Sequence, residues 1–189
     1  MAKEADQSPA DTQERLERLA RLIRSAGHAQ GLIPAQWDVL RYLARANAFS
    51  NAPAAAAQYL GATKGTVSQT IMALVKKGLV QSAKRGSDQR SITLHLTTKG
   101  RECLALDPLA ALAKNIEVLG GKTQRRFSKA VSELLLAESE RQDHATFGVC
   151  TDCRFLLHSK PPACTSFGAA LDPETLHLLC YRFKRVKKD

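Results

Sequence analysis

The sequence predicts a mainly α-helical protein with one β-hairpin, an α+β chain in which helices dominate. Apolar residues recur at three- and four-residue spacing over most of the chain, as they do on the buried face of a helix. Between Leu79 and Leu96 the spacing changes to the alternation typical of strands. Of the 189 residues, 44% are hydrophobic, which is enough for the core of one domain with an appendage.

The first part of the chain predicts three helices in succession. The first runs from Pro9 to near Gly31, and its apolar side consists of Leu16, Leu19, Leu22 and Ile23. Pro34 opens the second helix, on which Trp37 is assigned to the core. The third helix is short and Ala-rich, from Pro53 to Gly61. Residues 1–8 precede all of this without any periodic pattern, and we expect them to be disordered.

A fourth helix begins after Thr63, whose hydroxyl suits the N-cap position, and stops at Gly78. The buried stripe that its spacing predicts consists of Val67, Ile71, Leu74 and Val75. Leu79–Ser82 then reads as a strand and Ile92–Leu96 as a second one. The connection between the strands, residues 84–90, is charged and contains Gly and Asp for the turn.

Two longer helical regions follow the hairpin. Thr97 or Thr98 caps the first, which we expect to run from Gly100 to about Leu119. The second runs from Lys122 to about His144, after a break at two glycines. From residue 147 onward the composition changes to a cysteine-rich segment with few helical runs.

The charge of the chain points to an anionic partner. The formal net charge is +10, and residues 76–101 contain seven Lys and Arg against a single acidic residue, Asp88. Such a concentration of positive charge favours phosphate groups. No apolar run is long enough to span a membrane, and the N-terminus has no secretory signal pattern, so we expect a cytoplasmic protein.

The order of the predicted elements indicates which anionic partner the chain binds. A tight helix pair followed by a basic hairpin is typical of the winged helix-turn-helix, in which one helix enters the DNA major groove. The hairpin, or wing, lies beside that helix against the backbone and the minor groove. The sequence thus predicts a protein that binds double-stranded DNA.

At five places in order, the sequence resembles the MarR family of transcriptional regulators. The matching segments are residues 32–40, Thr66–Thr70, Lys77–Val80, Asp88–Ser91 and Leu96–Gly100. The resemblance covers residues 9–146 as a winged-helix DNA-binding and dimerisation domain, and leaves residues 147–189 outside as a cysteine-rich tail. It implies a homodimer whose long first and last helices interlock, bound to a palindromic operator as a regulator, here a repressor.

The resemblance also implies which residues contact DNA. The recognition helix corresponds to residues 63–77, and its candidates for groove contacts are Lys64, Thr66, Ser68, Gln69 and Thr70. Gln can pair bidentately with adenine, whereas Ser and Thr serve bases or phosphates. The family often has Arg at the position of Gln69. In the wing, Arg90 resembles the arginine that enters the minor groove and Asp88 the residue that orients it, while Lys84 and Arg85 would hold phosphates.

The tail holds four of the five cysteines of the chain, Cys150, Cys153, Cys164 and Cys180. In a reducing compartment clustered cysteines indicate metal ligands or redox thiols. Four thiolates suit Zn²⁺ or an iron–sulfur cluster, and the spacing does not choose between these two. A metal-free thiol switch, or replacement of some ligands by His158 or His177, stays open. Cys103 stands apart, and we expect it to be a small buried side chain.

Three functions remain in competition. The first is a DNA-binding regulator whose tail responds to metal or redox state, and the second is a regulator that responds to a small-molecule effector and has a structural zinc tail. The third, a thiol-redox or metal-dependent enzyme, is disfavoured because no nucleophile–base pattern, phosphate-binding loop or dinucleotide fingerprint is present in the sequence. The sequence therefore predicts a regulator and not an enzyme.

Overall fold

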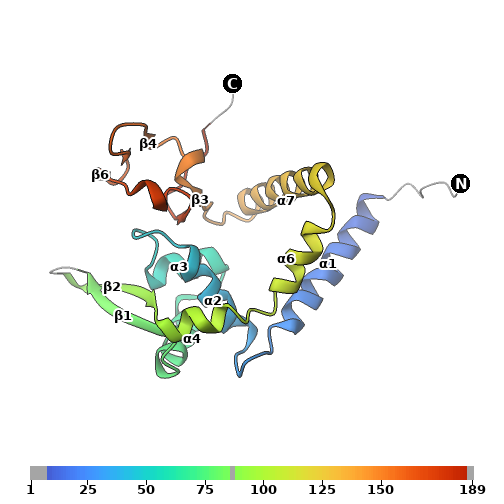
Figure 1. Ribbon diagram of the computed structural model, residues 1–189, viewed down its shortest axis with the longest axis horizontal. Coiled ribbons are helices and arrows are strands. Elements are labelled where there is room, and N and C mark those ends of the chain that lie inside the picture. Colours follow the sequence, from blue (N-terminus) through green and yellow to red (C-terminus); the bar gives the residue numbers. More distant parts are fainter. Residues whose placement is uncertain (1–7, 86–87, 187–189) are drawn as a thin grey trace, which may run out of the picture.

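The computed structural model describes residues 8–85 and 88–186, and for residues 85 and 88–91 the backbone alone. The N-terminal part has the order α1 (Pro9–Ala26), α2 (Pro34–Arg45), α3 (Pro53–Leu60), α4 (Lys64–Lys76), β1 (Val80–Arg85), β2 (Asp88–Leu96), α5 (Thr98–Leu104), α6 (Ala110–Glu117) and α7 (Gly121–Arg141). The tail adds β3 (Gly148–Val149), the 3-10 turn η1 (Cys150–Asp152), β4 (Leu156–Leu157), β5 (Ala163–Cys164), β6 (Ala169–Ala170), the 3-10 turn η2 (Pro173–Thr175) and β7 (Leu179–Cys180). The predicted helix-dominated fold with the hairpin β1–β2 is thus confirmed, and the tail adds two small antiparallel sheets, β3–β7 and β4–β5–β6, that the sequence did not predict (Figure 1). The expected disorder of residues 1–8 falls almost entirely on residues 1–7, which lie outside the described part.

The main core lies between α2, α3, α4 and the hairpin. Trp37, Val39 and Leu40 on α2 are fully buried, as are Ala56 on α3 and Leu74 on α4. The hairpin closes this core, since Val80 and Leu94 are each 2% exposed. Burial of these side chains holds α4 in a fixed position against α3 and β1.

The helix borders follow the capping residues that the sequence contains. The Thr63 hydroxyl accepts the Thr66 N–H at 3.2 Å, and the Thr97 hydroxyl accepts the Gly100 N–H at 3.0 Å. Gly100 is required for packing, because a Cβ there would lie 2.1 Å from the Leu79 carbonyl oxygen. The predicted stripe of α4 is wrong at one position, because Val75 lies at the edge of the stripe and is 39% exposed.

Three helices remain almost unpacked within the single chain. None of α1, α6 and α7 contains a buried residue, although α1 and α7 both carry apolar stripes. They lie on the side of the molecule away from the hairpin (Figure 1). The first helix also ends earlier than predicted, at Ala26, and residues 27–33 lead into α2 instead. None of the helices in the described ranges is long and apolar enough to cross a membrane.

The helix predicted from Gly100 to about Leu119 is in fact two helices. It breaks between Leu104 and Ala110, where Pro108 disfavours a helical conformation at the residue before it. Asp107 in this break accepts two hydrogen bonds from the Arg41 guanidinium, at 2.7 and 2.8 Å, and one from the Leu109 N–H. The side chains are 23% and 18% exposed, so this bidentate pair joins α2 to the break in a partly desolvated setting.

We expect Asp107→Asn to lower the free energy of unfolding by about 1–3 kcal/mol, since the Arg41 charge then loses its partner. Burial alone would raise the pKa of the Asp107 carboxyl, but the Arg41 and Leu109 bonds and the Arg41 charge outweigh it and lower this pKa. A lowered folded-state pKa gives stability that is present above the unfolded value of about 3.9 and is lost as pH falls through the folded value. Urea titrations should therefore show the full difference in free energy of unfolding between the wild type and Asp107→Asn at about pH 7, and a smaller difference near pH 3. A difference that does not change with pH would contradict the role of this pair.

Candidate DNA interface and cysteine module

One face of α4 is polar and open to solvent. Lys64, Thr66, Ser68 and Gln69 are exposed, as the sequence predicts for groove-contacting residues. Thr70 differs, because it is half-buried and its hydroxyl donates to the Thr66 carbonyl at 3.0 Å. The Thr66 hydroxyl lies 2.8 Å from the Thr63 hydroxyl at the start of the helix. Lys64, Ser68 and Gln69 are therefore the better candidates for ligand contacts.

The buried stripe of α4 fixes which residues point farthest outward. Val67, Ile71 and Leu74 face the core, and at 100° per residue Gln69 lies almost opposite them. Lys76 lies seven positions after Gln69 and shares its face. Gly65 lies on the same side, where the missing side chain leaves the backbone open to close approach. The sequence prediction omitted these two residues because it followed the family's pattern and did not use the angle around the helix.

The hairpin extends beside α4 as an antiparallel pair. Its register joins Val80 to Leu96 and Ser82 to Leu94, with an irregularity at Lys84 and Arg85. The backbone of β1 places Lys84 near the outer end, where the side chain is exposed. The side chains of Arg85, Asp88 and Arg90 lie outside the described residues, so their predicted contacts stay predictions.

The four tail cysteines lie in one small part of the structure, residues 147–186, which we call the cysteine module. Cys150 directly follows β3 and Cys180 ends β7, and these strands pair with Gly148 opposite Cys180. Cys150, Cys153, Cys164 and Cys180 are all free thiols and all buried, between 5% and 9% exposed. Burial and the three other thiols raise the pKa of the Cys150 thiol to about 11. Gly148 is needed at its position, because a Cβ there would lie 2.6 Å from the Phe183 ring.

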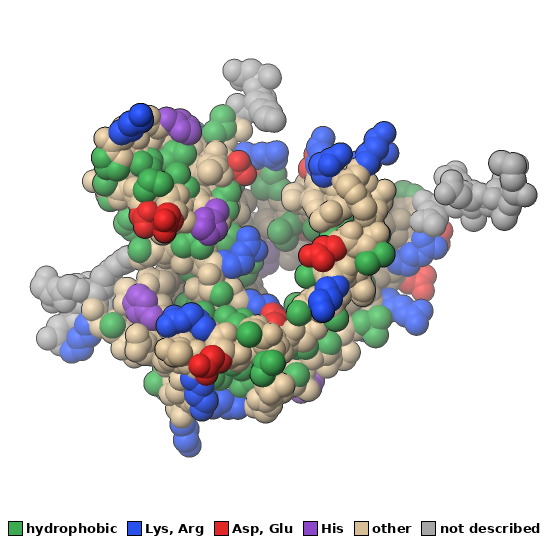
Figure 2. All heavy atoms as spheres, viewed as in Figure 1, with side chains coloured by type: hydrophobic (Ala, Val, Ile, Leu, Met, Phe, Trp, Pro, Cys, Tyr) green, Lys and Arg blue, Asp and Glu red, His purple; other side chains and the backbone are tan. Residues whose placement is uncertain are grey.

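Four cysteine thiols are chemically suited to bind a metal as thiolates, but their side chains are not arranged around a common metal position. Within the described ranges no three His, Cys, Asp or Glu side chains stand in a ready metal-binding arrangement. His158 and His177 are exposed, and Figure 2 shows histidine side chains at the surface of the tail. Cys103 lies apart on α5 and is half-buried, so the expectation of a buried side chain there was only partly correct.

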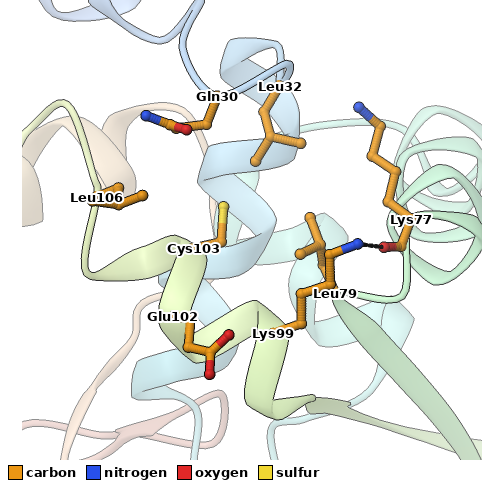
Figure 3. Close-up of a pocket in the computed structure, with 8 residues that line it drawn as sticks. All are labelled: Gln30, Leu32, Lys77, Leu79, Lys99, Glu102, Cys103 and Leu106. Atoms are coloured by element: carbon orange, nitrogen blue, oxygen red, sulfur yellow. Dashed lines mark hydrogen bonds between the residues drawn. The ribbon is translucent and has the colours of Figure 1, made fainter.

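A separate pocket of about 410 Å³ lies between α5, the end of α4 and the segment before α2. Figure 3 shows Cys103 pointing into it and the Lys99 amino group donating to the Lys77 carbonyl. The lining residues are Gln30, Leu32, Lys77, Leu79, Lys99, Glu102, Cys103 and Leu106. Both lysine amino groups donate to backbone carbonyls, Lys77 to Gly31 and Lys99 to Lys77, and Glu102 adds a carboxylate to the apolar walls.

The core of α2, α3 and α4 with the hairpin beside an exposed polar helix defines a winged-helix protein. Within this class, residues 30–91 match the model of the MarR family. The tail lies outside the matched segment. No curated protein sequence matches the chain.

Solved structures give the same fold. A MarR transcriptional regulator from Methanosarcina mazei Go1 is similar with a TM-score of 0.55 and 22% identity, covering 69% of this chain and 96% of its own. MepR of S. aureus, solved in complex with DNA, has a TM-score of 0.55 and 17% identity, with coverages of 67% and 96%. PcaV of Streptomyces coelicolor, solved with its natural ligand, has a TM-score of 0.52 and 19% identity, with coverages of 73% and 99%.

Proposed function

We propose that the protein is a transcriptional regulator that binds a palindromic operator in double-stranded DNA as a homodimer. The observation that carries this proposal is the exposed polar face of α4, held rigidly by the core next to a basic hairpin. In this arrangement Gln69 would read base edges, whereas Lys64 and Lys84 would contact phosphates. The MepR structure in complex with DNA supports the same use of the fold.

The unpacked helices support the homodimer. Apolar side chains on α1 and α7 are strongly exposed in the single chain, at Leu16, Leu22, Val131, Leu134 and Leu135. A soluble chain rarely leaves such stripes open, and a second copy of the same helices would cover them. Figure 2 shows hydrophobic side chains among the charged ones on this side of the molecule. Two α4 helices related by a two-fold axis would then read two half-sites.

Repression is the mode of control that this architecture supports most directly. A dimer bound across a palindromic site covers the DNA between its wings and excludes other proteins from it. This effect requires no contact with the transcription machinery. We place this activity in the cytoplasm. The proposal is a regulator and not an enzyme, in line with the similar solved proteins, which are named as regulators.

For the tail, we propose that Cys150, Cys153, Cys164 and Cys180 bind Zn²⁺ or an iron–sulfur cluster. The support is four buried free thiols in one small module, whose sulfurs would draw together around the metal. When bound, the metal would supply a rigid link between segments that otherwise share only two-residue strands. The signal sensed by the regulator would then be metal supply or the redox state that limits it.

A second signal is supported by the pocket beside Cys103. A small aromatic acid bound between Lys77 and Lys99 would contact both the end of α4 and α5, and so would connect the DNA-binding part to the α5–α7 region. In that case the metal in the tail would be structural only. DNA affinity that changes with such an acid, and does not change on metal removal, would favour this alternative.

The test of DNA binding uses an operator selected from random duplexes, followed by titration at several salt concentrations. Lys64→Ala should reduce the slope of log affinity against log salt by about one, because one phosphate contact is lost. Gln69→Ala and Arg90→Ala should each cost about 1–3 kcal/mol with the selected operator, because a groove contact is lost.

Lys160→Ala is the matched control, because this exposed lysine of the tail lies far from α4 in the sequence and its loss changes the net charge equally. It should leave both the affinity and the salt slope unchanged. If Lys64→Ala and Lys160→Ala behaved alike, the α4 face would not be the DNA contact. A selection without any enriched duplex would refute sequence-specific binding altogether.

A further inference from the structure

Residues 46–51, the loop between α2 and α3, connect the cysteine module to the winged helix by backbone hydrogen bonds. The Asn47 N–H donates to the Leu179 carbonyl at 2.9 Å, and Ala46 and Leu179 form a parallel bridge. The Tyr181 N–H donates to the Ser50 hydroxyl at 3.0 Å. Both neighbours of Cys180 are therefore hydrogen-bonded to this loop.

Side chains also cross between the two parts in both directions. Leu179 is 7% exposed and belongs to the same core as Trp37. In the other direction, Phe49 leaves the loop to stack on Phe167, with ring centroids 4.1 Å apart, and packs against the cluster around Cys150. The order of the cysteine module and the position of the loop thus depend on each other.

The same loop supports the DNA-binding elements from the other side. The Asn51 carbonyl accepts the Leu94 N–H of β2 at 2.7 Å. The Ser50 carbonyl accepts the Tyr42 hydroxyl at 2.6 Å, and the Ser50 hydroxyl donates to the Asn47 side chain at 2.7 Å. Helix α3, which packs on α4, begins at Pro53, two residues after the loop. A shift of the loop would move the base of the wing and the start of α3.

We propose that the cysteine module controls DNA binding through loop 46–51, with the metal-bound module as the form that binds DNA tightly. This inference rests on the proposed DNA-binding function and on metal binding by the four cysteines. Metal binds only the ordered module, and the ordered module holds the loop; loss of metal frees β7 and loosens the support of β2 and α3. Coupling of this kind between two sites typically changes affinity roughly 5- to 150-fold.

The experiment compares the full chain in three states: reduced and chelated, loaded with Zn²⁺ alone, and reconstituted with ferrous iron and sulfide. Fluorescence anisotropy with the selected operator should give roughly 5- to 150-fold tighter binding in the state that carries the native metal. Because linkage is reciprocal, operator DNA should raise the metal affinity by the same factor. The two metal arms distinguish zinc from a cluster as the native occupant.

Phe49→Ala is the variant that should uncouple the two parts, since it removes the stack on Phe167 and leaves all four cysteines in place. Phe155→Ala is its control, because Phe155 packs against the same cysteine cluster from within the tail. The ratio of DNA affinities with and without metal should fall toward one in Phe49→Ala and persist in Phe155→Ala. In the unaltered protein, hydrogen exchange at the Leu94 amide should slow on metal binding, because this amide donates to the Asn51 carbonyl of the loop.

The outcomes separate this inference from the function on which it rests. DNA binding that is equally tight with and without metal, together with unchanged exchange at Leu94, would overturn the coupling and leave the regulator intact. A chain that binds no DNA in any of the three states would overturn both. If the ratio of DNA affinities with and without metal stayed high in Phe49→Ala, the coupling would not depend on the contact between Phe49 and Phe167. That result would overturn the proposed coupling through loop 46–51.

Discussion

Replacement of any one of Cys150, Cys153, Cys164 and Cys180 by serine is expected to remove most of the bound metal and to open the tail to protease. A hydroxyl is a poor substitute for a thiolate ligand, so a four-thiolate site loses much of its affinity with the first replacement. The tail depends on this binding, because its strands are two residues long and Leu171 and Leu179 are its only buried aliphatic side chains in the described part. A module of this size rarely folds without a metal or a cross-link.

Elemental analysis of anaerobically purified protein, with limited proteolysis of the same samples, measures both effects. Cys103→Ser is the matched control, because Cys103 lies on α5, outside the cysteine module, and should change neither the metal content nor the cleavage pattern. A wild-type protein with neither zinc nor iron would refute the metal site and leave a thiol switch or plain packing. If Cys103→Ser lost the metal and the four tail variants kept it, the proposed set of ligands would be wrong.

The fold could be predicted where local chemistry decides it. Pro34 and Pro53 start helices because proline suits the first helical turn, and Thr63 and Thr97 cap helices through their hydroxyls. The two-residue alternation of the hairpin is also visible in the sequence alone. The polar face of α4 was also predicted from the sequence, but the Thr66 hydroxyl is bonded to the N-cap Thr63 and the Thr70 hydroxyl to the Thr66 carbonyl.

The features that the sequence did not predict depend on contacts between distant residues. The break at Asp107 has a local signal in Pro108, which the prediction missed, but its bond to Arg41, 66 positions earlier, has none. Phe147 begins the cysteine-rich segment in the sequence, yet it packs edge-on against Tyr42 and Tyr59 of the winged helix. The bond between Tyr181 and Ser50 joins residues 131 positions apart. The docking of the cysteine module on the loop between α2 and α3 was therefore visible only in three dimensions.

These contacts bear on how the regulator would respond to its signal. In the fold itself, α4 and the wing are held by the core formed with α2 and α3, and the tail adds Leu179 to that core from outside. A change in the tail can then act on the DNA-binding elements without any movement of the long helices α1 and α7. Dimerisation and signal response would accordingly depend on different surfaces, which separate variants can test.

A Val131→Glu/Leu135→Glu double variant is expected to convert the protein from a dimer to a monomer and to weaken operator binding by about 10²–10⁴-fold. Val131 and Leu135 are 41% and 67% exposed in the single chain and lie on one face of α7, so the new carboxylates would be buried only if a partner covers this face. The DNA effect follows because a monomer engages one half-site at a time and loses the gain from the linked second site.

Light scattering measures the mass, for which a monomer is 20.6 kDa, and anisotropy measures operator affinity. Lys129→Glu is the control on the opposite face of α7, where the side chain is 77% exposed, and it should remain dimeric. A wild-type mass near that of the monomer would refute the homodimer. If dimerisation and DNA binding are energetically linked, the double variant must lose both the dimer and the tight operator binding. A double variant that dissociates but still binds the full operator as tightly as the wild type would therefore show that the two half-sites are not read together.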